Sequence, residues 1–176
     1  MEVPGVGRVE RQEEFGWLCS RPLPIGAFGG HRCRILLEGY EDDARKEDFH
    51  VAIANLRFSE RDLLHEAARD VFRYYEDMNR DWDRSGPEYV EAALHNIWEH
   101  VQLGSDLHIS RRASGGQAIY VSLECNCDWE PEHGLQLVFK EGLAVVKVGP
   151  YDGHLTNADA YDDPALEGTI YKANTI

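Results

Sequence analysis

The segment spanning residues 117–154 constrains the fold of this chain more than any other stretch. Its first part reads IYVSLECNCDWE and places an apolar side chain at every second position. Because successive side chains of a β-strand point to opposite faces, this alternation predicts a strand with one buried face and one polar face. The predicted buried face consists of Ile119, Val121, Leu123, Cys125, Cys127 and Trp129. Its two thiols are therefore expected in the core, where a free cysteine behaves as a small apolar residue.

Two more strands are predicted in the same segment. Residues 135–140 alternate apolar and polar side chains, and residues 143–148 are mostly apolar. Glu141-Gly142 between them is typical of a two-residue hairpin connection, since glycine adopts positive φ without steric cost. Together with a preceding strand at residues 107–112, these segments predict an antiparallel meander of four strands.

The rest of the chain predicts two N-terminal strands and two helices. Residues 32–40 and 48–57 alternate apolar and polar side chains, which predicts a hairpin whose charged tip, residues 41–48, is solvated. Apolar residues recur at helical spacing over residues 60–79 and 88–103. Because strands and helices are segregated along the chain, the predicted fold class is α+β, with both helices packed on one face of an antiparallel sheet.

Residues 1–176 are predicted to form a single domain, because a chain of this length buries a substantial core. Residues 1–14 are polar and glycine-rich, which predicts a flexible segment. Two prolines restrict residues 15–25 to an edge strand or an extended arm. A domain boundary at residues 82–87 is the alternative, but neither half alone would bury its helix well.

Two strings near the C-terminus, CDWEPEHGLQLVFKEG and VGPYDGHLTNADAY, resemble the signature of an uncharacterised family of bacterial domains. The resemblance rests on Cys127, Trp129, Glu130, Glu132, His133, Gly134, Gly149, Asp152, Gly153 and His154. It is close over the C-terminal part of the chain and weak near the N-terminus. The resemblance implies a bacterial protein, and some members of such families are held to be immunity or accessory proteins of polymorphic toxin systems. It implies no established activity.

The chain is strongly acidic, with 32 Asp and Glu residues against 18 Lys and Arg residues and a formal net charge of −14. Such a surface repels nucleic-acid phosphates and favours a basic partner. The alternative is that the charge only maintains solubility. No apolar run is long enough to cross a membrane, and the N-terminal sequence lacks the apolar segment of a signal peptide. The four cysteines are therefore expected to be reduced thiols of a cytoplasmic protein.

A group of polar residues flanks the predicted meander in two turns. Its members are Asp128, Glu130, Glu132, His133, Asp152 and His154. Because the start of one antiparallel strand lies beside the end of the next, the two turns can meet at one end of the sheet. Imidazoles and carboxylates can ligate zinc or supply an acid–base pair. Turn stabilisation and a partner-binding surface are the alternatives for the same residues.

The charge, the lack of a recognised catalytic motif and the resemblance together predict a non-catalytic binding protein of the bacterial cytoplasm. Its expected partner is a basic protein, which an immunity-type role would neutralise. No nucleic acid, membrane or cofactor is expected, and the oligomeric state is left open. The predicted binding residues are Trp129, Glu130, Glu132, His133, Asp152 and His154. The alternative is a metal-dependent hydrolase using Glu130, Glu132, His133, Asp152 and His154, with His133 and His154 as the candidate metal ligands.

Overall fold

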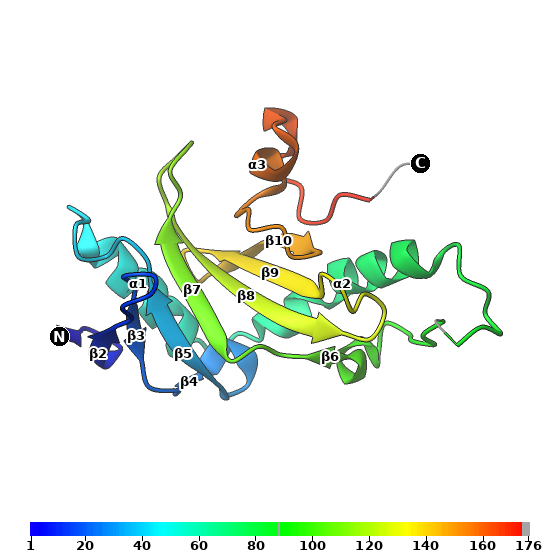
Figure 1. Ribbon diagram of the computed structural model, residues 1–176, viewed down its shortest axis with the longest axis horizontal. Coiled ribbons are helices and arrows are strands. Elements are labelled where there is room, and N and C mark those ends of the chain that lie inside the picture. The colour runs from blue at the N-terminus through cyan, green and yellow to red at the C-terminus, as the bar shows by residue number, and fades with distance from the viewer. Residues whose placement is uncertain (88, 174–176) are drawn as a thin grey trace. The chain divides into compact units, whose positions relative to one another are not determined.

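The computed structural model describes residues 1–87 and 89–173 and confirms the α+β class (Figure 1). Its strands are β1 (Glu2–Val3), β2 (Gly7–Arg11), β3 (Leu18–Ser20), β4 (Leu23–Ile25), β5 (His31–Leu37), β6 (Val101–Gln102), β7 (Asp106–Arg111), β8 (Ile119–Cys127), β9 (Leu135–Lys140) and β10 (Ala144–Gly149). Its α-helices are α1 (Lys46–Arg57), α2 (Leu63–Asn79) and α3 (Asn157–Tyr161). Short 3-10 helices are η1 (Gly26–Phe28), η2 (Ile97–His100) and η3 (Pro164–Leu166).

The strands of the described residues form one mixed sheet in the order β1-β2-β3-β5-β7-β8-β9-β10, with β4 paired to β5 and β6 paired to β8. The pairs β1–β2, β2–β3, β3–β5, β4–β5, β6–β8 and β7–β8 are antiparallel, whereas β5 and β7 run parallel. The run β7-β8-β9-β10 occupies the place of the predicted meander. The prediction of two N-terminal strands is wrong, because β1 to β5 all precede α1.

The chain forms two compact units, and each unit is built from separate segments of the sequence. Unit 1 comprises Met1–Leu64, Gly104–Leu123 and Phe139–Ala144. Unit 2 comprises His65–Leu103, Glu124–Val138 and the chain from Val145 onward. Neither unit corresponds to a division at residues 82–87, since that stretch lies inside unit 2.

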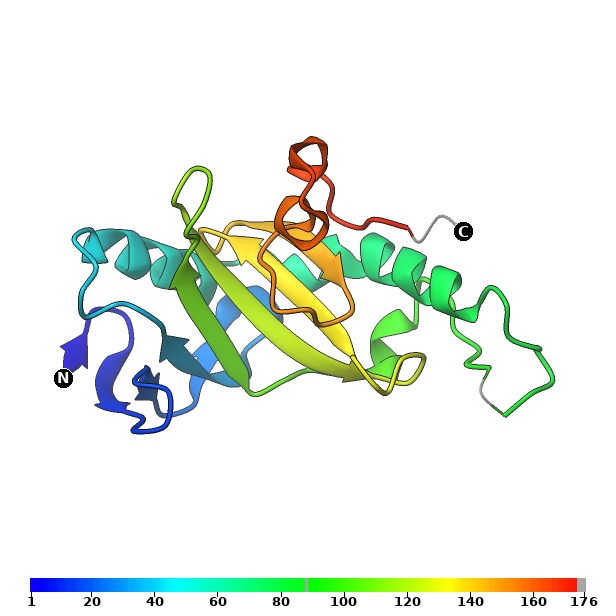
Figure 2. The ribbon, with the colours of Figure 1, turned by 45° about the horizontal axis from the view of Figure 1, so that its top comes forward.

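The largest correction in unit 1 concerns residues 48–57, which form most of helix α1 and not a strand (Figure 2). Phe49, Ala52, Ile53 and Leu56 are all buried, at the spacing of one helix face. Val51, which strand alternation would bury together with Phe49 and Ile53, is 57% exposed. The short apolar run fits both periods, and packing selects the helical one.

The charged residues 41–48 are not a solvated hairpin tip, because Asp43 before α1 and Asp48 in its first turn bind Arg111 of β7. Arg111 Nε lies 2.7 Å from Asp43 Oδ2, and Arg111 Nη1 lies 2.8 Å from Asp48 Oδ2. The Arg111 guanidinium also donates to the carbonyl of Gln117, at 2.6 Å. The hydrogen bonds that Arg111 donates to Asp43 lower the pKa of this carboxyl below its usual 3.8. The segment is therefore tied to the sheet of unit 1 by a charge-assisted cluster.

Residues 1–25 are more regular than their composition predicts. Strands β1 and β2 form where a flexible segment is predicted. Val3 of β1, Val9 of β2 and Val6 between the two strands are buried. Strand β4 contains Pro24 and pairs only with β5 among the described strands, as an edge strand would, whereas β3 in the same predicted stretch lies between β2 and β5 and is not at an edge. Proline is tolerated in β4 because an edge strand can leave one backbone group unpaired.

In unit 2 the first predicted helix is confirmed and the second is wrong. Helix α2 ends at Asn79 as predicted, whereas the described part of residues 88–103 contains turns, η2 and β6. Backbone N–H groups there find partners outside a helix: Tyr75 Oη accepts from Ala92, and Asn96 Oδ1 accepts from Ala93. Among the described residues, no helix combines the length and apolarity that a membrane crossing needs.

Strand β8 confirms the predicted buried face, but the alternation with exposed side chains begins only at Glu124, because Tyr120 and Ser122 on the opposite face are buried as well. All six predicted core side chains are at most 5% exposed, while Glu124, Asn126 and Asp128 on the opposite face are exposed. The hairpin after β9 is confirmed as well, because Glu141 and Gly142 both have positive φ, at 53° and 67°. A Cβ atom on Gly142 would lie 2.2 Å from the carbonyl oxygen of Ala52, so α1 also requires glycine at this position.

Candidate functional site

Two turns of unit 2 meet, one after β8 and one after β10. The backbone N–H of Tyr151 donates to the carbonyl of His133 at 3.1 Å. We call residues 128–134 and 150–154 together the rim. The two turns therefore lie at the same end of the sheet, as the predicted site requires.

The first turn of the rim is held by Glu130. Its carboxylate accepts the backbone N–H groups of Glu132, at 2.9 Å, and His133, at 3.2 Å. The carbonyl of Glu130 accepts from Gly134, whose φ is 62° and whose Cβ, if present, would lie 2.4 Å from the carbonyl oxygen of Cys125. Glu130 therefore closes the turn, and its side chain is only 13% exposed.

The second turn is held by Lys147 of β10, which the sequence analysis missed. Its ammonium group donates to Gln136 Oε1 at 2.8 Å, to the carbonyl of His154 at 3.1 Å, and to Asp152 Oδ1. Burial lowers the pKa of Lys147, and the hydrogen bond that Lys147 donates to Asp152 opposes this shift. Asp152 also accepts the backbone N–H of His154 at 2.8 Å. A lysine inside the apolar run LAVVKVG was the available signal, because a buried ammonium needs acceptors.

The imidazoles and carboxylates of the rim form separate pairs. His133 Nδ1 lies 3.4 Å from Glu130 Oε2, and His154 Nδ1 lies 3.4 Å from Asp152 Oδ1. Asp128 turns to η2 and β6, where its carboxylate contacts His100 Nδ1 at 3.1 Å and accepts from Gln102 Nε2 at 3.2 Å. Within the described part of the chain, no three His, Cys, Asp or Glu side chains come together as a metal site would require.

Trp129 lies in the core and not on the surface. It is 5% exposed and packs edge-on against Tyr74 and Tyr75 of α2, with ring centroids 6.0 and 5.8 Å away. Tyr74 in turn donates its hydroxyl to the carbonyl of Gly134 at 3.0 Å. These contacts fix the first turn of the rim onto α2, which is the role that Trp129 has in this structure.

The two thiols of β8 belong to the same core. Cys125 is 2% exposed and Cys127 is 4% exposed, and neither is in a disulfide. Burial raises the pKa of Cys127 to about 12. Core packing, the interpretation made from the strand alternation, is confirmed.

The rim therefore divides into groups that build it and groups that face solvent. Glu132, His133, Tyr151 and His154 are exposed, and the side chain of Glu132 has no bonding partner among residues 1–87 and 89–173. Such a surface combines a carboxylate, two imidazoles and an aromatic ring on a backbone that the turns hold in place. It is suited to contact with another molecule, and the aromatic ring is typical of protein interfaces.

Comparison with known proteins shows the family of this chain. Residues 5–155 match a family described as a domain of unknown function, DUF6985, and the chain belongs to that family. The match includes both turns of the rim. The expected membership of an uncharacterised family is thus confirmed. No curated protein and no solved structure matches the chain.

Proposed function

We propose that this chain is a non-catalytic binding protein for a basic protein partner, and that the rim of unit 2 is its contact surface. The observation that carries the proposal is the exposure of rim groups that the fold does not use. Glu130 and Asp152 close the turns, whereas Glu132 faces solvent with no partner among the described residues. Glu124 of β8 is exposed in the same way.

The net charge of −14 supports a basic partner over a neutral or acidic one. Complementary charge accelerates encounter and disfavours partners of like charge. Most of this effect is lost beyond a Debye length of about 8 Å at physiological salt. Binding through the rim should therefore weaken as salt is raised.

Within this proposal, an immunity-type role is the form that the charge favours, since an acidic surface can cover the basic active surface of a toxin domain. The bacterial cytoplasm is the proposed location. None of the four cysteines is in a disulfide, which is usual in a reducing compartment.

The test uses the protein encoded beside this gene, purified and titrated calorimetrically at about 50 mM and about 300 mM salt. The double variant Glu124→Lys, Glu132→Lys should weaken binding at least tenfold, an expectation for two reversed charges at an interface. The matched control is Glu13→Lys, Glu14→Lys, which makes the same charge change in an exposed loop of unit 1. Binding should then change less than about threefold. No complex at either salt, or equal losses in both variants, contradicts the rim as the contact surface.

A metal-dependent hydrolase at the same rim is the competing proposal. The hydrogen bond between the two turns supports the hydrolase, because His133 and His154 then lie on adjacent turns. Elemental analysis of protein purified without chelator separates the two functions. A stoichiometric metal that disappears in His133→Ala would favour the hydrolase over the binding protein.

A further inference from the structure

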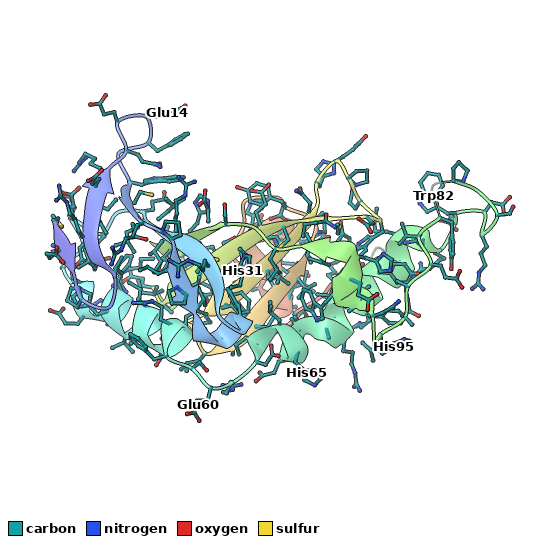
Figure 3. The ribbon with its side chains drawn as sticks, turned by 90° about the horizontal axis from the view of Figure 1, so that it is seen from below. Glu14, His31, Glu60, His65, Trp82 and His95 are labelled. Atoms are coloured by element: carbon teal, nitrogen blue, oxygen red, sulfur yellow. The ribbon has the colours of Figure 1, made fainter. Side chains whose placement is uncertain are left out.

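An aromatic pocket lies at the C-terminal end of α2 in unit 2. It has a volume of about 360 Å³, and its walls include Phe72, Tyr75, Trp82 and Tyr89 together with the carboxylate-bearing Glu76. Trp82 is 48% exposed and stands on the loop beyond α2 (Figure 3). This loop, which the sequence alone suggests is only a connection, therefore contributes a large exposed ring to a concave surface.

The walls of the pocket are fixed by hydrogen bonds. Tyr75 donates its hydroxyl to the carbonyl of Val90 at 2.8 Å and accepts the N–H of Ala92 at 3.1 Å. Asn79, which is 7% exposed, accepts the N–H of Val90 at 3.2 Å, and its carbonyl accepts the N–H of Trp82. The last turn of α2 thus positions both sides of the pocket before any ligand arrives.

The chemistry of the walls favours a cation. Aromatic ring faces carry partial negative charge and attract ammonium and guanidinium groups. One such cation–π contact is present in the pocket, because the Arg84 guanidinium lies 5.9 Å from the ring centroid of Tyr89. Arg80, the other cation of the pocket, is bound to Asp77.

Exposed carboxylates add to the attraction, although Asp83 already accepts the backbone N–H and the hydroxyl of Ser85. The side chain of Glu76 is exposed and makes no hydrogen bond or ion pair with any residue that the structure describes. Asp81 and Asp83 flank Trp82 and are also exposed. A cation that enters the pocket would therefore meet the aromatic rings of its walls and negative charge.

We propose that this pocket binds one lysine or arginine side chain of the partner. The inference rests on the proposed function for the identity of that partner, but the pocket can be tested without it. The cationic group stacks on the rings of Trp82 and Tyr89, and the carboxylate of Glu76 pairs with it. Tyr75 also packs against Trp129, so the pocket and the rim share one aromatic support.

The first experiment titrates isotope-labelled protein with Nα-acetyl-lysine amide, and in parallel with Nα-acetyl-norleucine amide, which has the same chain without the ammonium group. The readout is the backbone amide resonance of Ala92, whose N–H is bonded to the Tyr75 hydroxyl. A saturable shift is expected for the lysine compound only. No shift with either compound, or equal shifts with both, would overturn the proposal.

Substitutions of single side chains test whether the lysine compound binds in this pocket. Trp82→Ala should weaken binding of the lysine compound about tenfold, equivalent to about 1.4 kcal/mol, whereas Trp82→Phe should retain it within about threefold. The matched control is Phe15→Ala, which removes a 56% exposed ring of unit 1 and should change nothing. Arg84→Ala should leave binding unchanged or strengthen it, because it removes the internal competitor. Loss of binding in Arg84→Ala would show that the pocket needs Arg84 to bind the lysine compound, which contradicts the role of Arg84 as an internal competitor and with it the proposal.

The two proposals fail in different ways. If the rim variants abolish binding of the basic protein but the lysine compound causes no shift, the pocket is wrong and the function stands. If the compound binds the pocket but no basic protein partner binds the chain, the pocket stands and the proposed function does not.

Discussion

Two carboxylate clusters of this chain resemble each other in composition, but they leave different groups available to a partner. In unit 1, Asp43 and Asp48 both bind Arg111, and the cluster is closed. In unit 2, Lys147 forms an ion pair with Asp152 of the rim, and Glu132 remains exposed. Carboxylates of a charged stretch therefore stay exposed where they outnumber the buried cations that they pair with.

The physical reason is the desolvation of the cation. An ammonium or guanidinium group removed from water must be surrounded by acceptors, or it destabilises the fold. Lys147, with a side chain 2% exposed, meets this need with three oxygen atoms. Four measurements test whether the two clusters differ in this way.

Lys147→Ala should lower the free energy of unfolding most, by about 3 kcal/mol, because Gln136 and Asp152 lose their buried donor. Urea denaturation measures the change. Lys147→Met should recover part of the loss by filling the space with an apolar chain. Lys140→Ala, at an exposed position of β9, is the control and should change stability by less than about 0.5 kcal/mol. Equal losses at Lys147 and Lys140 would show that Lys147 does not hold the rim.

Arg111→Ala should lower the free energy of unfolding by about 2 kcal/mol, since Asp43 and Asp48 lose their bonds to the guanidinium and keep only Arg45 as a partner. Binding of the basic partner should stay within about twofold of wild type, because the cluster of unit 1 is closed. Arg21→Ala, an exposed position in the same unit, is the stability control. A large loss of binding in Arg111→Ala would end the distinction between the two clusters.

The pH dependence of stability should reflect Asp43. Its pKa in the folded state is below 3.8, so its contribution is present above pH 3.8 and is lost as pH falls through the folded value. Denaturation of wild type and Asp43→Asn at several pH values measures this. Wild type should be the more stable above pH 3.8, and the difference should shrink below it. A constant difference across this range would mean that Asp43 contributes through packing alone.

Glu132→Gln should have the smallest effect on stability, less than about 0.5 kcal/mol, because the side chain has no partner in the described structure. Its effect should appear in binding, where removal of the charge weakens the complex and reduces its salt dependence. Calorimetry at two salt concentrations shows both changes. A stability loss comparable to that of Lys147→Ala would place Glu132 among the groups that build the rim.

Sequence reasoning worked best where the signal was local. The alternation in β8 predicted its buried face, and Glu141-Gly142 predicted the hairpin, because side-chain period and turn conformation depend on adjacent residues. The meeting of the two turns was predicted as a condition, and the contact between Tyr151 and His133 fulfils it. The support of the rim by Lys147 was not predicted, since alternation assigns a strand residue to a face but does not show which acceptors of the neighbouring strand and turn surround its ammonium group.

The wrong secondary-structure predictions have one cause. The run FHVAI before residue 54 fits a strand as well as a helix, and only the exposure of Val51 distinguishes them. Residues 88–103 carry helical spacing, but Tyr75 and Asn79 of α2 bind the backbone between residues 90 and 92 and hold it outside a helix. Tertiary hydrogen bonds outweigh propensity differences of less than 1 kcal/mol per residue.

Periodicity and composition were enough to predict the α+β class, the buried thiols of β8 and the acidity of the chain. The tertiary structure alone decided which carboxylates are bound to Arg111 and Lys147 and which remain exposed. It also decided that Trp129 supports α2 from within, while Trp82 faces solvent beside Tyr89. The reason is that periodicity assigns a side chain to a face, whereas desolvation and pairing depend on atoms far away in the sequence.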